Sequence, residues 1–390
     1  MPSSPYTDIA IVAPTSFGYT RYSEHGAQWF LGGVLREMLK HAGLNKTAVD
    51  GVAVASFTLA PDTVVALTEY LSLSPRWIEH LPYGGASGVM AMQRAARAVQ
   101  NGDAGVVACI AGDTHRREGF KDLLSNFSRF SADSVYPYGA GGPNSVFAMI
   151  TRAYMERTGA TREDFGRICT AQRFNATHFD SALLKEPLSM ADYLNARLVA
   201  DPLHLFDCVM PCAGAEGFLV MSVDRARSLN LPFARILAIG ERHNAFRDDE
   251  IVSRGGWDTY RDALYAAAGV GPAEIDLLET YDDYPVIVML QLEDLGFCAK
   301  GEAPEFVRRT ALTFNGGGLP HNTSGGQLSA GQAGAAGGFL GLVEALRQLT
   351  VPGLQNAVTD ARSALVSGYG MVNYDRCLCT SAAILAREIA

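Results

Sequence analysis

Thiols and imidazoles are the side chains in this sequence whose spacing could support catalysis or metal binding. The cysteines include two close pairs, Cys208 with Cys212 and Cys377 with Cys379. Neither pair has a nearby histidine or the two-residue spacing typical of zinc ligands, so we predict no metal site. His243 and His321 are the histidines best placed for a base, because we expect both in loops of the second half. A lone loop histidine is usually solvated, and we assign neither a role.

Two glycine- and serine-rich loops could bring backbone N–H groups close to a ligand. The segment YGGASG at Tyr83–Gly88 precedes a helix of small residues and then an apolar strand. The segment NTSGG at Asn322–Gly326 likewise precedes a small-residue helix and an apolar strand. Such a coarse repeat favours duplication of one α/β unit. Alternation of this kind occurs in any α/β protein, so the periodicity alone leaves duplication open.

The elements that must position these loops follow from hydrophobic periodicity. Short apolar runs alternate with helical patterns, which predicts a sheet covered by helices on both faces. The expected strands are Ile9–Ala13, Val52–Ser56, Gly105–Gly112, Gly217–Ser222, Ala234–Ala238, Ile275–Glu279, Ala364–Val366 and Leu378–Leu385. The expected helices are Gln28–Ala42, Asp62–Leu71, Val89–Asn101, Ser145–Thr158, Arg162–Thr177, Thr259–Gly269, Tyr284–Asp294 and a stretch from near Gln332 to Leu349.

We expect two similar halves, residues 1–228 and 233–390, joined by a linker at Ser228–Pro232. Residues 113–202 break the alternation, because this stretch is polar, carries aromatic residues and mixes helices with loops. We predict that it forms an excursion packed over the core, a common place for substrate contacts.

Composition narrows the class of protein. The chain has 390 residues, a net charge of −9 and a pI near 5.4, which argues against a nucleic-acid surface but not against a local basic patch. The apolar runs are too short to span a membrane, and no early basic and apolar stretch indicates a signal peptide. The seven cysteines lack the spacing of a disulfide framework, so we predict reduced thiols and a cytoplasmic protein.

Several segments together resemble thiolases, most of all those associated with sterol-carrier and lipid-transfer proteins. The matching segments are GGASG at Gly84–Gly88, FDCVMPCAGAEGFLVM at Phe206–Met221, ETYDDY at Glu279–Tyr284, NTSGGQLSAGQAGAAGG at Asn322–Gly338 and SGYG at Ser367–Gly370. The resemblance covers essentially the whole chain. It implies an α/β thiolase fold, with two similar halves in a layered α/β/α/β/α arrangement, and a homodimer paired through the sheet edge of the first half.

The side chains on which thiolase chemistry depends are replaced here. The family uses a nucleophilic cysteine at a helix start, a histidine in an HD-aromatic motif, a histidine in a GHP motif and a second cysteine. In this sequence those positions fall on Gly85, Tyr281, Gln332 and Ser367. We therefore expect no covalent thiolase turnover.

The resemblance also implies a different reaction. Some thiolase-fold proteins of the lipid-transfer type resemble retro-aldolases, which cleave a β-hydroxyacyl-CoA without an acyl-enzyme and use a tyrosine at the HD-aromatic position. By this likeness Tyr281 is the candidate base and Gln332 the candidate oxyanion donor. Asp282 or its neighbour Asp283 could accept the tyrosine proton, and Ser87 could donate a hydrogen bond. The candidate substrate contacts are Gly85, Asn322, Ser324, Gly325, Ser367 and Tyr369, and we expect the last two to lie on a closing glycine loop, SGYG.

Structural roles remain open for each of these residues. Tyr281 could simply pack beside a helix that Asp282 or Asp283 caps. Gln332 and Ser87 could be chosen for fit at crowded helix starts. Cys208 and Cys212 are expected to be buried as small hydrophobic residues.

Two alternatives for the whole chain also remain. One is a non-catalytic acyl-CoA-binding, lipid-binding or scaffold subunit of a complex, and the other is an acetyl-CoA acetyltransferase-type acyltransferase that uses Cys208 or Cys212. The expected partners are an acyl-CoA and a second copy of the chain. A small zinc-ribbon/OB-fold protein is a further candidate partner. We expect no cofactor beyond the CoA thioester.

Overall fold

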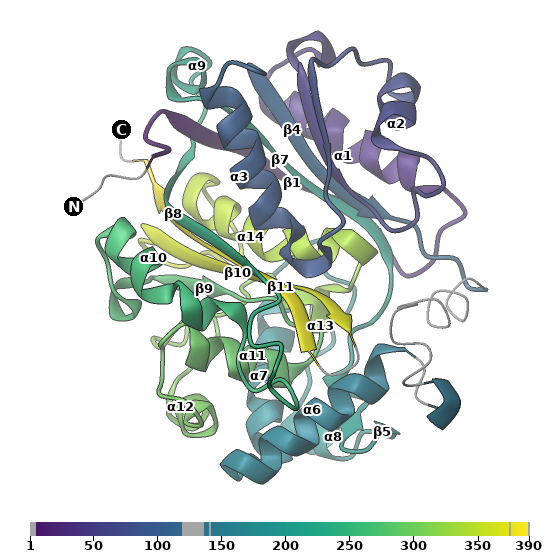
Figure 1. Ribbon diagram of the computed structural model, residues 1–390, viewed down its shortest axis with the longest axis vertical. Coiled ribbons are helices and arrows are strands. Elements are labelled where there is room, and N and C mark those ends of the chain that lie inside the picture. The colour runs from purple at the N-terminus through teal and green to yellow at the C-terminus, as the bar shows by residue number, and fades with distance from the viewer. Residues whose placement is uncertain (1–4, 119–135, 140–141, 374–375, 389–390) are drawn as a thin grey trace.

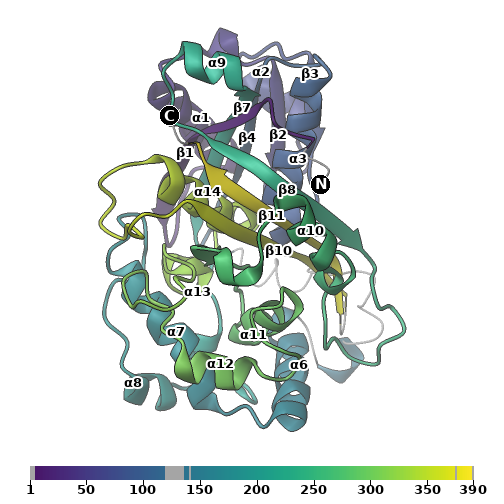
Figure 2. The ribbon, with the colours of Figure 1, turned by 90° about the vertical axis from the view of Figure 1, so that its left-hand side faces the viewer.

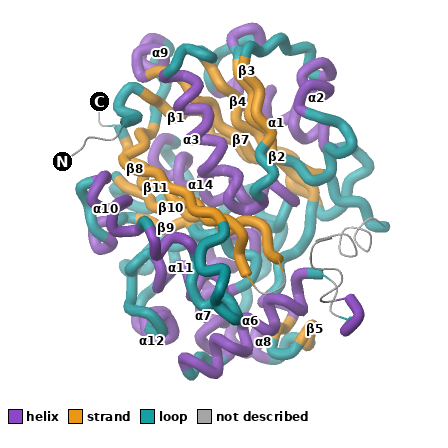
Figure 3. The backbone as a smooth tube through the Cα atoms, viewed as in Figure 1, coloured by secondary structure: helices purple, strands orange, loops and turns teal. Residues whose placement is uncertain are grey.

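A mixed sheet of nine strands forms the centre of the computed structural model, which describes residues 5–118, 136–139, 142–373 and 376–388. The strands lie in the order β3-β2-β4-β7-β1-β8-β11-β10-β9 (Figure 3). Their bounds are β1 Ile9–Thr20, β2 Gly51–Ala55, β3 Trp77–His80, β4 Val106–Asp113, β7 Ala213–Ser222, β8 Ala234–His243, β9 Leu277–Glu279, β10 Ser363–Asn373 and β11 Arg376–Arg387.

The strand arrangement occurs twice along the chain. In the first half β2 runs parallel to β4, and β4, β7 and β1 follow as antiparallel neighbours. In the second half β9 runs parallel to β10, and β10, β11 and β8 follow in the same way. One residue pair, Ile11 opposite Ala234, joins the two halves. The predicted pair of similar halves is confirmed, whereas the boundaries at residues 228 and 233 stay a prediction.

Helices form layers outside and between the two halves of the sheet. Helix α1 (Ala27–His41) covers the outer face of the first half, and α10 (Arg261–Ala268) covers part of the second. Between the halves lie α3 (Ser87–Gln100) and α14 (Gly337–Thr350), which pack against each other through the middle of the molecule (Figure 1). Both central helices are almost entirely buried, and their apolar side chains form one core with both halves of the sheet. This layered arrangement is the predicted one.

The excursion lies below the sheet in the views of Figures 1 and 2. Its described helices are α6 (Pro143–Thr158), α7 (Arg162–Ala176) and α8 (Met190–Leu194), followed by the short strands β5 (Leu198–Ala200) and β6 (Leu203–His204). Helix α7 packs on α11 (Pro285–Asp294), α12 (Ala303–Arg309) and α13 (Gly326–Ala330) of the second half, and α6 also packs on α11. Residues 119–135 and 140–141, which the prediction included in the excursion, lie outside the described residues.

The remaining elements complete the architecture. Helix α2 (Val64–Tyr70) follows β2, and α9 (Val223–Ser228) ends where the predicted linker begins. Short 3-10 turns lie at Lys46–Ala48, Gly84–Ala86, Tyr136–Tyr138, Leu205–Asp207, Gly256–Thr259, Pro272–Glu274 and Gly334–Ala336. Among the described residues, no helix is long and apolar enough to cross a membrane.

Two glycine-rich segments of the second half differ from their prediction. The SGYG segment was expected to be a loop, but Ser367 and Tyr369 lie within β10, paired with β11. A Cβ at Gly370 would lie 1.9 Å from the carbonyl oxygen of Tyr83, so this glycine permits close packing of the strand rather than a turn. The helix expected to begin near Gln332 begins at Gly337, because Gly331 and Gly334 adopt positive φ and interrupt it.

Candidate active site

Gly85 and Tyr281 lie in direct contact at the centre of the molecule. Gly85 belongs to the turn Gly84–Ala86 that precedes α3, and Tyr281 follows β9 by two residues. A Cβ placed on Gly85 would lie 2.1 Å from Cε2 of Tyr281 and 2.3 Å from the carbonyl oxygen of Tyr369. The tyrosine ring therefore occupies the space into which a side chain at position 85 would project.

The hydroxyl of Tyr281 meets the amide of Gln332. Nε2 of Gln332 donates a hydrogen bond of 3.4 Å to the Tyr281 hydroxyl oxygen, and the Tyr281 ring lies nearly parallel to that of Tyr369 with centroids 6.4 Å apart. Burial raises the pKa of Tyr281 well above its usual value, and Asp283 adds to this effect, while the hydrogen bond from Gln332 opposes it. The phenol therefore keeps its proton at neutral pH.

The two aspartates after Tyr281 have different surroundings. Asp282 is 2% exposed, and its carboxylate accepts hydrogen bonds from the backbone N–H groups of Gln327 (3.0 Å) and Leu328 (3.3 Å) at the start of α13. Asp282 therefore caps α13. Burial raises the pKa of Asp283 to about 8, with Asp282 adding to the effect and Tyr281 opposing it. Among the described residues, Oδ1 of Asp283 is buried without a hydrogen-bond partner.

A buried carboxylate holds the loop that carries Gln332. Asp113, at the end of β4, is 1% exposed and accepts hydrogen bonds from Thr58 N (2.6 Å) and Ala335 N (2.7 Å). The backbone N–H of Gln332 itself donates to the carbonyl oxygen of Met210 at 2.9 Å. The backbone at position 332 is thus fixed from both sides, and its side chain is directed by the loop rather than by a helix.

The predicted residues of the NTSGG loop serve mainly to shape it. Asn322 has a φ of +43°, and its side chain bonds the backbone N–H of Thr280 (2.8 Å) and its carbonyl oxygen (3.0 Å). Ser324 Oγ accepts from Gly326 N at 3.3 Å, and Gly325 N donates to the carbonyl oxygen of Asn322 at 2.7 Å. Asn322 borders the same small gap as Tyr281 and Asp282, but its side chain is already bonded to Thr280, and Ser324 and Gly325 are bonded within the loop.

Ser87 and Ser367 are also bonded within the protein. Ser87 is fully buried, and its hydroxyl donates to the carbonyl oxygen of Leu81 and accepts from Tyr83 N, both at 3.2 Å. Ser367 donates to Oε1 of Gln291 at 2.7 Å. The two hydroxyls hold the turn at Gly85 and strand β10 in place around Tyr281.

The two histidines that were predicted to lie in loops differ in their exposure to solvent. His321 is fully buried, and its Nε2 lies 2.7 Å from the hydroxyl oxygen of Thr280, so its expected solvation was wrong. Burial lowers the pKa of His321 to about 3, which keeps the ring neutral. His243 is exposed, but it ends β8 rather than lying in a loop.

A cavity of about 130 Å³ opens beside Gln332. Tyr281 lines a separate gap of about 10 Å³ rather than this cavity, and its hydroxyl is connected to the cavity wall through the hydrogen bond with Gln332. The cavity is lined by Phe57, Thr58, Asp113, Thr114, His115, Pro143, Asn144, Cys208, Val209, Pro211, Cys212, Tyr284, Gln332 and Gly334.

Several residues of this wall were not among the predicted site residues. Tyr284 donates a hydrogen bond of 2.5 Å to Oδ1 of Asn144 and stacks on Phe147, which joins the excursion to α11 across the cavity. Tyr284 lies in the recognised ETYDDY segment, so the motif pointed to it. Asp113, His115 and Asn144 belong to no such segment, and only their place within the predicted excursion pointed to them.

The thiols of the cavity are protonated. Burial raises the pKa of Cys208 to about 12, with Asp207 adding to the effect, and burial also raises the pKa of Cys212. Cys212 is 2% exposed and Cys208 is half-buried. Because the thiolate is the nucleophilic form, neither thiol is activated here. Within the described parts of the chain, no group of three His, Cys, Asp or Glu residues could hold a metal ion.

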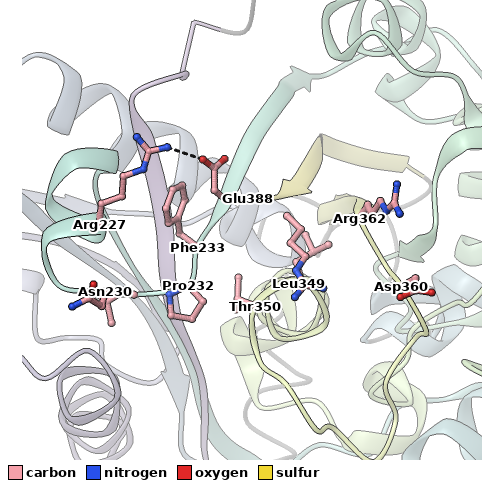
Figure 4. A pocket seen from close by; sticks show the side chains of 11 residues that line it. Arg227, Asn230, Pro232, Phe233, Leu349, Thr350, Asp360, Arg362 and Glu388 are labelled. Carbon is pink, nitrogen blue, oxygen red and sulfur yellow. Dashed lines mark hydrogen bonds and ion pairs between the residues drawn. The ribbon is translucent and has the colours of Figure 1, made fainter. Parts of the chain in front are cut away.

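A larger cavity lies elsewhere, where the connection between the halves passes the end of α14. It measures about 760 Å³ and is lined by residues that include Arg227, Phe233, Leu349, Arg362 and Glu388 (Figure 4). None of the predicted site residues lines it.

Comparisons with known proteins agree with the thiolase fold. Residues 241–383 match the family model described as thiolase C-terminal domain-like. A steroid side-chain-cleaving aldolase of Thermomonospora curvata is 34% identical over 323 residues, which cover 78% of this chain and 81% of the relative. A 17-hydroxy-3-oxo-4-pregnene-20-carboxyl-CoA lyase of Mycobacterium tuberculosis is 33% identical, with 80% and 84% covered. The solved structure of an Ltp2-ChsH2(DUF35) aldolase superposes with a TM-score of 0.84 at 28% identity, covering 97% of this chain and 98% of that one.

Proposed function

Since the chain belongs to the thiolase superfamily, in the branch of the sterol-carrier-type thiolases and the Ltp2 aldolases, we propose that it cleaves a carbon–carbon bond of a β-hydroxyacyl-CoA by a retro-aldol reaction. The observation that carries this proposal is the 3.4 Å contact between the Tyr281 hydroxyl and Nε2 of Gln332 beside the cavity. In a β-hydroxyacyl thioester, the hydroxyl and the thioester oxygen are borne by carbons with a single carbon between them. A base and an oxyanion donor that serve both must therefore be close together.

The proposed reaction needs no covalent enzyme intermediate. The Tyr281 oxygen takes the proton of the substrate β-hydroxyl, and the electron pair of that O–H bond forms the new carbonyl. The bond between Cα and Cβ breaks, and its electron pair passes into the thioester as an enolate, whose oxygen accepts a hydrogen bond from Gln332. Protonation of Cα then yields a shortened acyl-CoA and a ketone or aldehyde.

Asp283 supplies the base strength that a neutral phenol lacks. Because burial keeps Tyr281 protonated, it can take the substrate proton only while passing its own to another group. Asp283 interacts with Tyr281 and has a buried oxygen without a partner among the described residues, which suits it to receive that proton. We assign Asp282 a positioning role, since its carboxylate caps α13.

The alternative acyl transfer is less well supported. Gly85 stands at the position of the family nucleophile, and Cys208 and Cys212 are held as thiols by burial. The non-catalytic alternative predicts CoA affinity without any cleavage.

Partner and substrate identity extend the proposal by analogy. The similar solved structure is named as a complex of two proteins, and we propose that this chain also pairs with a small DUF35-type protein. The names of two relatives indicate steroid-derived substrates, so we include such a thioester in the test.

The test is product analysis after incubation with β-hydroxyacyl-CoA thioesters, among them one with a steroid side chain, with and without a candidate partner. We expect equal amounts of shortened acyl-CoA and carbonyl product, and no acyl adduct on the intact protein. Tyr281→Phe should lower kcat by about 10²–10⁴-fold. Tyr70→Phe on the exposed face of α2 is the matched control, because it removes a phenol hydroxyl outside the cavity. CoA binding with no cleavage of any thioester contradicts the proposal, and an adduct mapped to a cysteine favours acyl transfer.

A further inference from the structure

A compact group of basic and aromatic side chains lies beside the cavity, and we call Arg21, Tyr22, His115 and Arg117 the mouth platform. The guanidinium carbons of Arg21 and Arg117 lie 5.4 Å and 4.9 Å from the centroid of the Tyr22 ring. The His115 ring stacks on Tyr22 with centroids 5.4 Å apart and planes at 20°. Tyr22 thus holds two cationic groups in the same small region.

The sheet register explains why residues so distant in sequence meet here. Strand β1 ends at Thr20 opposite Ala213, and β4 ends at Asp113 opposite Gly214. The two strands run in the same direction on either side of β7 (Figure 1), so their following loops leave the same edge together.

Two hydrogen bonds then tie these loops to each other. The backbone N–H of Ser23 donates to the carbonyl oxygen of His115 at 2.9 Å, and the hydroxyl of Thr114 donates to the carbonyl oxygen of His25 at 2.6 Å. The mouth platform is therefore built on a braced pair of loops rather than on independent surface side chains.

The mouth platform is continuous with the candidate active site. Thr114 and His115 line the same cavity as Gln332. Burial lowers the pKa of His115, and Arg21 adds to this effect, so the positive charge of the group resides on its arginines. Neither Arg21 nor Arg117 forms an ion pair with a described residue, although the chain carries a net charge of −9.

We propose that the mouth platform binds the phosphate groups at the nucleotide end of the CoA thioester, while the acyl end lies in the cavity beside Gln332. Guanidinium groups bind phosphate through paired charge-assisted hydrogen bonds, and two of them gathered around one aromatic ring suit the several phosphates of CoA. This inference rests on the proposed function for the identity of the substrate. It adds the place at which the nucleotide end of that substrate binds.

The experiment compares two doubly substituted proteins. Arg21→Gln with Arg117→Gln removes both guanidinium groups of the mouth platform. Arg97→Gln with Arg167→Gln removes the same charge from exposed positions on α3 and α7. Calorimetry measures the Kd of each protein for CoA and for adenosine 3′,5′-bisphosphate. We expect the platform variant to bind both at least about tenfold more weakly, and the control to match the unsubstituted protein.

Kinetics on the cleaved thioester provide a second readout. The platform variant should raise KM for the acyl-CoA without lowering kcat, and should leave the kinetics of the matching acyl-pantetheine unchanged, because that thioester lacks the nucleotide. Unchanged Kd values, or no binding of the bisphosphate by the unsubstituted protein, would overturn the inference. The inference would also be overturned if the platform variant kept full affinity for CoA but no longer bound a partner protein. The mouth platform would then be a protein-docking surface. Weakened CoA binding by a protein that cleaves nothing would support the inference while the proposed function fails.

Discussion

The ring of Tyr281 fills the space beside Gly85 that a side chain at position 85 would need. Its Cε2 atom lies 2.1 Å from the place of a Cβ, far inside van der Waals contact. Loss of the family cysteine and gain of the tyrosine are therefore two aspects of one packing solution. The pocket cannot hold both residues in this arrangement, so restoring a cysteine alone would displace the proposed base.

We predict that Gly85→Ala destabilises the protein and that Tyr281→Ala partly relieves the cost. Overpacking of this kind typically costs about 1–3 kcal/mol. Relief should be incomplete, because the carbonyl oxygen of Tyr369 also lies 2.3 Å from the new Cβ. Urea denaturation of both single variants and the double variant gives the coupling free energy. Gly271→Ala is the control, since the nearest atom to its Cβ would lie 3.7 Å away. Additive effects at positions 85 and 281 would show that the ring is not the obstacle.

Gln332 should contribute to the rate and little to substrate binding. Replacement by methionine keeps the length of the side chain but removes the amide N–H that we assign to the enolate oxygen. We predict a fall in kcat of about 10²–10³-fold with KM nearly unchanged. Gln332→His, which restores an N–H donor, should retain more activity than the methionine variant. If the two variants have equal activity, the oxyanion assignment is wrong.

The fold was predictable where its signals are local. Strand and helix periodicity predicted the alternation of strands and helices along each half, because each element buries its own apolar face. The two similar halves and their layers were predicted by the resemblance to thiolases, since periodicity alone left duplication open. Strand β10 was predicted too short, because the glycines of SGYG suggested a turn. The structure instead needs Gly370 because Tyr83 approaches it, and Gly368 because Gly85 and Ala86 approach it. These neighbours are almost 290 residues away in sequence and leave no local trace.

The sequence predicted only those site residues that stand at the positions of family motifs. The resemblance pointed to Gly85, Tyr281 and Gln332, and the structure brings these three together. It did not separate Asp282, which caps α13, from Asp283, whose carboxylate interacts with Tyr281, because the difference depends on which carboxylate meets the α13 N–H groups. Asp113 was missed for a similar reason, since its partner Ala335 lies in the other half of the chain.

The proposed role of Asp283 predicts how activity depends on pH. Burial raises its pKa to about 8, so the carboxylate that accepts the tyrosine proton becomes more populated as pH rises through that value. We expect kcat to rise between pH 6 and 8 with a slope approaching one on a logarithmic scale, and to level off above pH 8. Asp283→Asn should lower kcat and abolish this rise. A rise that persists in the variant would assign the titration to another group, such as Asp282, whose pKa lies at about 6.

A carboxyl group outside the site predicts how stability depends on pH. Glu216 is fully buried on β7, and burial raises its pKa to about 8, although the hydrogen bond from Ser16 (2.9 Å) opposes the shift. The folded protein then binds a proton that the unfolded chain releases near pH 4.5, so Glu216 makes stability fall as pH rises from about 4.5 to 8.

Glu216→Gln removes this titration while keeping the shape of the side chain. We predict that the loss of unfolding free energy between pH 5 and pH 8, measured by urea denaturation, is smaller in the variant by at most roughly 4 kcal/mol. Glu69→Gln on the exposed face of α2 should leave the loss unchanged. The part of the pH dependence that remains in Glu216→Gln then belongs to other buried carboxyl groups with raised pKa values, Asp283 among them. Identical pH dependence in Glu216→Gln and the unsubstituted protein would mean that the buried carboxyl ionises as readily in the folded state as in the unfolded one.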